Sequence, residues 1–180
     1  LFATISSNKE EEPVREISND YKQPLGSIII PTFNEENNIG KCLRSIVELD
    51  YSSFEIIVSD GGSQDRTIEI AREYADKVIV DKTVPSGWIG KNWGCYLGYK
   101  NASGKYLLFI DADTVHKKNS LKHFMKIALE RDTALLSVFP YQIINKWWES
   151  INAVFYFANH LINGGVNSIN NPKKMDSYSA

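Results

Sequence analysis

The sequence lacks several features that mark common classes of protein. Its 180 residues include 20 Lys and Arg against 22 Asp and Glu, and the net charge of −2 argues against a protein that coats nucleic acid. Two cysteines, Cys42 and Cys95, are too few for a disulfide scaffold and too far apart for a zinc site, which favours a reducing, cytosolic-facing location. No run of about 18 apolar residues occurs, so we expect no membrane-spanning helix in this sequence.

Several catalytic and nucleotide-binding motifs are also missing. Neither the Walker P-loop spacing nor Gly-x-Gly-x-x-Gly occurs, which argues against the usual ATPases and dinucleotide-binding domains. The absence of a Gly-x-Ser-x-Gly elbow disfavours a serine hydrolase. His116, His123 and His160 are scattered, without a zincin-type pair, and are more typical of surface or helix positions than of metal ligands.

The chain opens at Leu1 with neither a signal peptide nor an initiator Met, so we expect the natural N-terminus to lie upstream.

What the sequence does contain is typical of a folded α/β domain. Hydrophobic residues make up 43% and charged residues 23%, which excludes global disorder. Residues 1–25 are polar and carry Pro13 and Pro24 without sustained periodicity, which indicates a leader or linker. From Gly26 onward, strand-like runs alternate with helix-like periodicity. The predicted strands are 27–31, 54–59, 77–80, 105–110 and 134–139, and the predicted helices are 39–47, 65–75, 91–101, 119–130 and 147–162.

The alternation of strands and helices predicts the architecture. Residues 27–31 form a continuous apolar, β-branched run, typical of a strand covered on both faces, and residues 39–47 show the apolar stripe of a helix. Short connections between such elements predict a mostly parallel sheet with helices on both faces. Ligands bind these sheets at the carboxyl ends of the strands, where Pro31-Thr32-Phe33, Asp60-Gly61-Gly62 and Asp111-Ala112-Asp113 are expected.

The strongest local signal is the pair of carboxylates at Asp111 and Asp113. An apolar strand delivers them at i and i+2 into a loop, where they repel each other unless a cation lies nearby. Oxygen-only ligands suit a hard cation such as Mg²⁺ or Mn²⁺, which would also bind a diphosphate. The alternative is a solvated turn that contains two aspartates by chance.

Three other loops are weaker candidates. In Asp60-Gly61-Gly62-Ser63-Gln64-Asp65, helix capping explains the later residues, but Asp60 faces the expected crevice at a strand end. In the loop 32–37, the dipole of the following helix accounts for Glu35 as well as any ligand would. Gly90-Lys91 opens a helix, and backbone N–H groups with a lysine suit phosphate, although Gly-Lys pairs are common by chance.

The predicted helix at 147–162 shows a different pattern. Trp147, Trp148 and Phe155 share one helical face with aliphatic residues, and polar residues lie opposite. A wide aromatic stripe can lie in a membrane interface, where tryptophan is favoured, or it can pack on the domain core. Few lysines lie on the polar face, so its attraction to anionic lipid would be small.

Taken together, the motifs resemble those of family 2 glycosyltransferases with the GT-A fold. The resemblance rests on Ser27 to Glu35, Asp60 to Asp65 and Asp111-Ala112-Asp113, which occur in family-like order and separation within residues 26–140. Gly87-Trp88-Ile89-Gly90-Lys91 and the aromatic helix look most like membrane-associated members that act on lipid or isoprenoid acceptors. The resemblance implies a Rossmann-like core that binds a nucleotide sugar.

The resemblance also implies roles for individual residues. Thr32 and Glu35 would lie beside the donor nucleoside, and Asp60 would hydrogen-bond its base. Lys91 would approach the nucleotide or its phosphates. One position departs from the family pattern Asp-Asp-Gly-Ser, because Gly61 replaces the second Asp, and no role is assigned there.

The implied reaction is a metal-assisted, inverting transfer. Asp111 would face the ribose or the metal, and Asp113 would bind the Mg²⁺ or Mn²⁺ that bridges the donor diphosphate. The family's catalytic base is an acidic residue well after these aspartates. No match to its motif occurs before Ala180, so the base is expected beyond this residue, with residues 141–180 forming only the start of an acceptor-side region.

The resemblance further implies partners and a location. The donor would be a nucleoside-diphosphate sugar, with UDP favoured and GDP the second choice, and the acceptor a lipid or polysaccharide. The protein would associate with a membrane surface, with its catalytic domain on the cytoplasmic side. Two alternatives stay open. A nucleotidyltransferase would carry a Gly-rich basic loop where this chain has Asn34-Glu35-Glu36, and a non-catalytic nucleotide-sugar-binding or membrane-docking module would lack the base.

Overall fold

The computed structural model describes residues 23–131 and 134–138. The chain divides into two compact units, and the unit Ile17–Ala134 holds every described helix and strand. The second unit comprises Leu1–Glu16 and Leu135–Ala180. All of the residues discussed as a site below belong to the first unit.

Some of the sequence-based predictions concern the second unit or its boundary. The predicted helix at 147–162, the acceptor-side region at 141–180 and most of the leader at 1–25 lie outside the described residues. The predicted strand at 134–139 is wrong, because its described residues belong to no strand. An apolar run predicts a strand only where it is buried, and Leu135 is 81% exposed.

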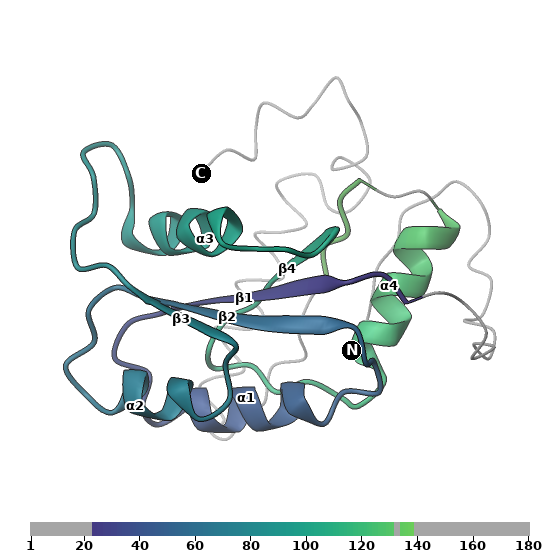
Figure 1. Ribbon diagram of the computed structural model, residues 1–180, viewed down its shortest axis with the longest axis horizontal. Coiled ribbons are helices and arrows are strands. Elements are labelled where there is room, and N and C mark those ends of the chain that lie inside the picture. The colour runs from purple at the N-terminus through teal and green to yellow at the C-terminus, as the bar shows by residue number, and fades with distance from the viewer. Residues whose placement is uncertain (1–22, 132–133, 139–180) are drawn as a thin grey trace, which may run out of the picture. The chain divides into compact units, whose positions relative to one another are not determined.

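A four-stranded parallel sheet forms the centre of the described unit (Figure 1). Its strands are β1 (Gly26–Thr32), β2 (Phe54–Asp60), β3 (Lys77–Val80) and β4 (Tyr106–Phe109), in the spatial order β3-β2-β1-β4. The predicted α/β fold with a mostly parallel sheet is thus confirmed. Because β2 lies on one side of β1 and β4 on the other, the strand order reverses at β1. The carboxyl ends next to such a switch point are where ligands bind.

Helices cover both faces of this sheet, as the alternation predicted. They are α1 (Ile39–Val47), α2 (Thr67–Arg72), α3 (Gly90–Lys100) and α4 (Ser120–Glu130). α1 and α2 lie on one face and α3 lies on the other (Figure 1). α2 is shorter than predicted: it begins at Thr67, whose N–H donates to Asp65 Oδ1 at 3.0 Å, and it ends at Arg72, after which the Tyr74 N–H donates to Ala71 O in a tightened turn. Within the described residues, no helix is both long and apolar enough to cross a bilayer.

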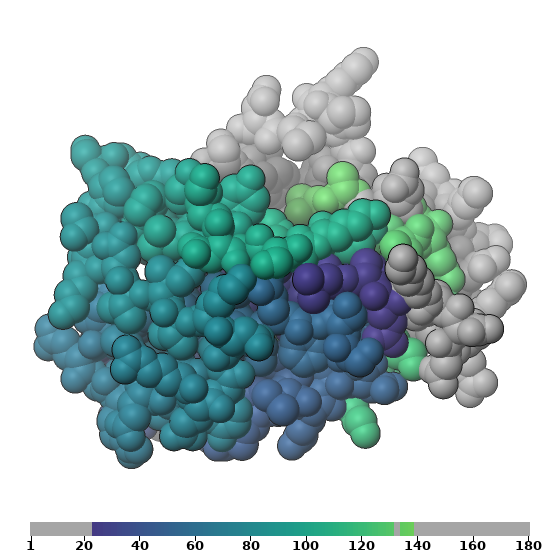
Figure 2. Space-filling model, viewed as in Figure 1, coloured from purple at the N-terminus to yellow at the C-terminus, as the bar shows by residue number. Residues whose placement is uncertain are grey.

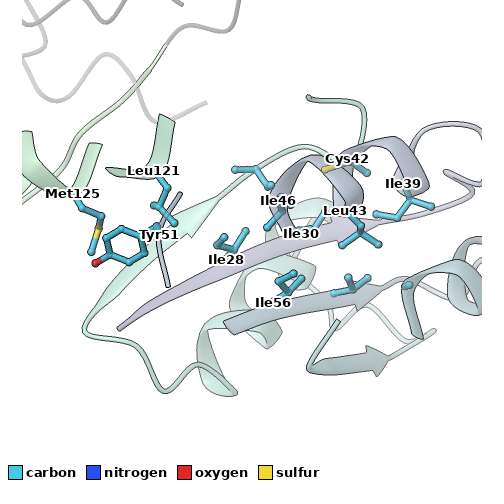
Figure 3. Close-up of a cluster of buried hydrophobic side chains, with 14 residues drawn as sticks. Ile28, Ile30, Ile39, Cys42, Leu43, Ile46, Tyr51, Ile56, Leu121 and Met125 are labelled. Atoms are coloured by element: carbon cyan, nitrogen blue, oxygen red, sulfur yellow. The ribbon is translucent and has the colours of Figure 1, made fainter. Parts of the chain in front are cut away.

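The main apolar core lies between the sheet and α1. Alternate residues of β1, Ile28 and Ile30, point towards α1, as does Ile56 of β2 (Figure 3). The apolar stripe predicted for α1 supplies the opposite side, where Leu43 and Ile46 are fully buried. The other members labelled in the same view are Ile39, Cys42, Tyr51, Leu121 and Met125.

On the opposite face, α3 approaches the sheet closely through glycine. A Cβ atom added at Gly98 would overlap the Ile29 side chain, and one at Gly94 would lie 3.1 Å from Pro31 Cβ. The Ser59 hydroxyl of β2 donates to Gly94 O at 2.7 Å. In the space-filling view, teal atoms of the α3 segment lie against the blue and purple atoms of the sheet (Figure 2). This close packing fixes the start of α3 near the carboxyl end of the sheet.

The amino end of the sheet is held by one carboxylate, Glu55 of β2. It accepts hydrogen bonds from the Ser27 hydroxyl at 2.6 Å and the Ser103 N–H, and Lys77 of β3 pairs with it at 2.9 Å. Partial burial alone would raise the pKa of Glu55, but these donors outweigh it and lower the pKa to about 2. Glu55 therefore ties together the starts of three strands and the approach to the fourth.

We expect this carboxylate to make folding stability sensitive to acid. Because the pKa is lower in the folded state, the stabilisation is present above the ordinary value of 4.5 and is lost as the pH falls towards about 2. The loss approaches at most about 1.4 kcal/mol per pH unit for one carboxylate. Urea unfolding measured from pH 6 to pH 2.5 should show a shallower decline for Glu55→Gln. Glu48→Gln, at an exposed glutamate, should keep the full decline. Parallel curves for both variants would contradict this account.

Candidate functional site

A cavity of about 530 Å³ opens at the carboxyl ends of β1 and β2, beside the loop that follows β4. This volume lies within the range of small-ligand sites. Its wall includes all six residues singled out from the sequence: Thr32, Glu35, Asp60, Lys91, Asp111 and Asp113. The structure therefore brings these residues together, and the particular role of each one stays a prediction.

Thr32 and Asp60 form a buried pair where β1 and β2 end. The parallel register sets them side by side, and the Thr32 hydroxyl donates to Asp60 Oδ2 at 3.0 Å. Asp60 Oδ1 accepts the N–H groups of Gly62 at 2.8 Å and Ser63 at 2.7 Å, and the Ser63 hydroxyl donates to Oδ2. A carboxylate has about four acceptor sites, and Asp60 uses four. The Asp60 carboxylate thus stabilises the loop through hydrogen bonds. An N–H group of a nucleotide base could bond to this carboxylate only by replacing one of these donors.

The two glycines of this loop differ in whether the structure requires glycine at that position. Gly62 has a φ of +94°, and an added Cβ would lie 2.6 Å from Lys82 Cγ, so this position requires glycine. Gly61 has room for a side chain, because an added Cβ would make only ordinary contacts, with the Phe33 ring at 3.4 Å and Thr32 O at 3.7 Å. Gly61 is the position where the sequence departs from the family pattern. The cavity wall there is formed by Gly61 itself and the exposed ring of Phe33.

The loops after β1 and β2 are bonded to each other. Asn34, at a left-handed φ of 54°, donates its N–H to Ser63 Oγ at 2.8 Å and accepts the Gln64 N–H at 2.9 Å. The Glu35 N–H donates to the Thr67 hydroxyl at 2.7 Å. The Glu35 carboxylate accepts the Asn38 amide at 2.9 Å. These contacts hold the Glu35 backbone at the cavity edge, and the sequence analysis assigned no role to Asn34.

Lys91 and Asp111 form an ion pair across the cavity. Lys91 Nζ lies 2.6 Å from Asp111 Oδ1, which joins the first turn of α3 to the loop after β4. The hydrogen bond to Asp111 raises the pKa of the Lys91 ammonium, against the effect of its partial burial. No side chain caps the start of α3, so its first N–H groups are available to an anion together with Lys91.

Asp113 is exposed, and its carboxylate has no hydrogen bond or ion pair within the described part of the chain. It follows Asp111 by two residues and lines the same cavity. Among the residues that the structure describes, no group of three His, Cys, Asp or Glu side chains could hold a metal. Two carboxylates still fit Mg²⁺ or Mn²⁺, because such ions often take one or two protein carboxylates and complete their shell with phosphate and water.

The loop that carries both aspartates is fixed through its backbone. The Thr114 hydroxyl donates to Asp111 O at 2.7 Å, and the buried Cys42 thiol lies 3.7 Å from the same oxygen. Burial raises the pKa of Cys42 to about 11, so the thiol stays protonated. The His116 N–H donates to Ser45 Oγ at 3.0 Å, and His116 is half-buried in this loop. The carboxylate groups themselves are not needed to hold the loop.

Asp81 and Trp93 are polar residues of the cavity wall that were not singled out from the sequence. The Trp93 indole donates to Asp81 Oδ2 at 3.1 Å, and its ring stacks on Tyr96 with a centroid separation of 5.4 Å. Asp81 directly follows β3, so the rule that identified the other strand-end residues would have identified it too. Nothing in the sequence pattern indicates that Trp93 faces the cavity.

Known proteins resemble this chain in sequence and in fold. The family model for glycosyl transferase family 2 matches residues 27–176. The 4,4′-diaponeurosporenoate glycosyltransferase of Staphylococcus aureus strain USA300 is 37% identical over 133 residues, covering 72% of this chain and 35% of that protein. The chain thus spans about a third of the length of the curated relatives it matches.

Solved structures show the same architecture. S. aureus TarS 1-349 in complex with UDP-GlcNAc is 28% identical with a TM-score of 0.52, covering 67% of this chain and 38% of that one. The mannosyltransferase PcManGT from Pyrobaculum calidifontis, in complex with GDP-Man and Mn²⁺, is 22% identical with a TM-score of 0.51. That match covers 63% of this chain and 34% of the other and indicates a shared fold alone.

Proposed function

This chain belongs to glycosyl transferase family 2, and from that membership we propose that it transfers a sugar from a nucleoside-diphosphate sugar to an acceptor hydroxyl. The observation that carries the proposal is the composition of the cavity wall. A lysine at an uncapped helix start suits a diphosphate, and two exposed carboxylates beside it suit a divalent cation. Both features lie at the carboxyl end of the sheet, where ligands of such folds bind.

For the donor, UDP is favoured over GDP. The TarS structures that resemble this chain at 28% identity hold UDP and UDP-GlcNAc. In the proposed complex, Thr32 and Glu35 lie beside the nucleoside, and Lys91 contacts the phosphates. Asp60 contributes through the loop it builds, and the wall formed by Gly61 and Phe33 faces the base.

Asp111 and Asp113 would hold Mg²⁺ or Mn²⁺ in this proposal. When bound, such an ion stabilises the negative charge that develops on the leaving nucleoside diphosphate. The two carboxylates place the negative charge that the cation needs at one mouth of the cavity. Thr114 and Cys42 contact the backbone oxygen of Asp111, so the backbone that carries the carboxylates is held in place before anything binds.

The acceptor in this proposal is lipid-linked or part of the cell envelope. The S. aureus relative is named for 4,4′-diaponeurosporenoate, and the similarity covers 72% of this chain. A lipid acceptor would place the protein at a membrane surface, with the catalytic domain on the cytoplasmic side. The transfer would be a single displacement with inversion, in which an acidic side chain not assigned among the described residues deprotonates the acceptor.

A nucleotidyltransferase is less well supported. Such an enzyme would place a flexible Gly-rich basic loop after the first strand. Here that loop contains Asn34, Glu35 and Glu36, and it is bonded to the loop after β2 through Ser63 and Thr67. The loop after β1 thus offers acceptor groups and a fixed backbone. Triphosphate binding instead needs donors and basic side chains.

The proposal is tested by a transfer assay on the intact protein. UDP-sugars and GDP-sugars are incubated with polyprenyl and carotenoid acceptors in detergent, and the anomeric configuration of any product is read by proton NMR. We expect transfer from a UDP-sugar with inversion. Retention would overturn the displacement mechanism. Tight donor binding without transfer to any acceptor or to water would favour a non-catalytic binding module.

A further inference from the structure

The ion pair between Lys91 and Asp111 occupies two groups that the proposed function needs for different ligands. Lys91 Nζ lies 2.6 Å from Asp111 Oδ1, and the side chains are 62% and 56% exposed. In the proposed donor complex, the ammonium contacts the diphosphate and the carboxylate contributes to the cation site. While this pair persists, Asp111 Oδ1 and one N–H of the ammonium already have a partner, so each ligand competes with the pair.

We propose that Lys91 exchanges partners on donor binding, leaving Asp111 for the diphosphate and so releasing Asp111 to the divalent cation. This inference rests on the proposed function. An ammonium and a divalent cation repel each other and cannot both bind one carboxylate oxygen at close range. The ammonium therefore competes with the cation when no donor is bound. Once the diphosphate takes the ammonium, donor and cation each strengthen the binding of the other, by reciprocal linkage.

The Lys91 side chain can change partners with little loss of free energy. An exposed ion pair contributes little to stability, and the four-carbon stem of lysine lets the ammonium move without moving the helix. α3 itself is held to the sheet by Gly94 and Gly98, so the base of the Lys91 side chain stays in place. The uncapped first turn of α3 offers the diphosphate N–H groups next to the ammonium.

On the carboxylate side, the position of Asp111 does not depend on Lys91. Its backbone oxygen is held by Thr114 at 2.7 Å and faces the Cys42 thiol at 3.7 Å. The charge of Asp113 adds a smaller attraction for the Lys91 ammonium than that of Asp111. Removal of the ammonium leaves two neighbouring like-charged groups without this counterion, and such a pair binds a cation more strongly.

The decisive variant is Lys91→Met, studied in the intact protein with MnCl₂ and UDP as the probes. We expect Mn²⁺ alone to bind about threefold to fivefold more tightly than in the unaltered protein, which corresponds to the loss of one exposed charge pair. UDP alone should bind about tenfold more weakly. The factor by which UDP enhances Mn²⁺ binding should shrink accordingly. Calorimetry measures the affinity for Mn²⁺ alone, for UDP alone, and for each in the presence of the other, without a measurement of enzymatic activity.

Two further variants control for charge and for folding. Lys100→Met removes the same charge from the last turn of α3 and should leave the Mn²⁺ affinity unchanged. Lys91→Arg keeps a cation that can pair with Asp111 and should retain the weak binding of Mn²⁺ alone. An unchanged or weaker Mn²⁺ affinity in Lys91→Met, with UDP still bound, would overturn the exchange and leave the proposed function standing. Failure of the unaltered protein to bind UDP with or without Mn²⁺ would overturn the proposed function and the exchange together.

Discussion

Replacement of Asp113 by alanine is expected to lower metal-dependent sugar transfer by about 10²–10³-fold, the usual cost of losing one group that stabilises transition-state charge. The side chain is exposed and has no hydrogen bond or ion pair within the described part of the chain. Its loss should therefore leave the urea midpoint unchanged. Initial rates measured over a range of Mn²⁺ concentrations, together with urea unfolding of the same samples, give both quantities.

A matched control separates this effect from a general loss of negative charge. Asp50→Ala removes an exposed carboxylate that pairs with Lys122 at 3.3 Å and does not line the cavity. This control should keep normal transfer at every Mn²⁺ concentration. Near-normal transfer by Asp113→Ala would contradict the assignment of Asp113 to the cation, whatever the control shows.

Replacement of Asp60 by alanine should instead act on stability. The carboxylate is 2% exposed and accepts hydrogen bonds from Thr32, Gly62 and Ser63. The variant leaves these donors without an acceptor in a largely buried place. A loss of about 2–4 kcal/mol in the free energy of unfolding is expected. Urea unfolding of Asp60→Ala measures it directly.

Asp60→Asn is the informative companion variant. Its amide keeps one oxygen for the N–H groups of Gly62 and Ser63 but turns a donor towards the hydroxyls of Thr32 and Ser63, which can rotate to accept it. We expect it to recover at least half of the stability lost in Asp60→Ala. Equal stability of Asp60→Ala and the unaltered protein would show that the loop does not depend on this carboxylate.

The fold was predictable because its signals are local. The apolar run at 27–31 predicts a buried strand, and the stripe at 39–47 predicts the helix that packs on it; both are confirmed as β1 and α1. The strand order and register arise from long-range pairing, so the sequence could not supply them. The strand predicted at 134–139 failed because hydrophobicity indicates burial and does not ensure that a partner strand is present.

The site was only partly predictable, for a similar reason. The position of residues after strands located Thr32, Asp60 and Asp111 near one another before the register was known. The contacts that give these residues their properties depend on geometry. The Lys91–Asp111 pair joins residues twenty positions apart, and three of the four hydrogen bonds of Asp60 depend on the turn of its own loop. Sequence patterns thus predicted residues that line one cavity but not the contacts among them.

The proposed function requires that this cavity bind a nucleoside diphosphate together with a divalent cation. Calorimetric titration of the intact protein with UDP and with GDP, each with and without Mn²⁺, measures this binding. We predict saturable binding of UDP that strengthens when Mn²⁺ is present and loses that enhancement in Asp113→Ala. A protein that is folded by circular dichroism but binds neither nucleotide under either condition would contradict the claim.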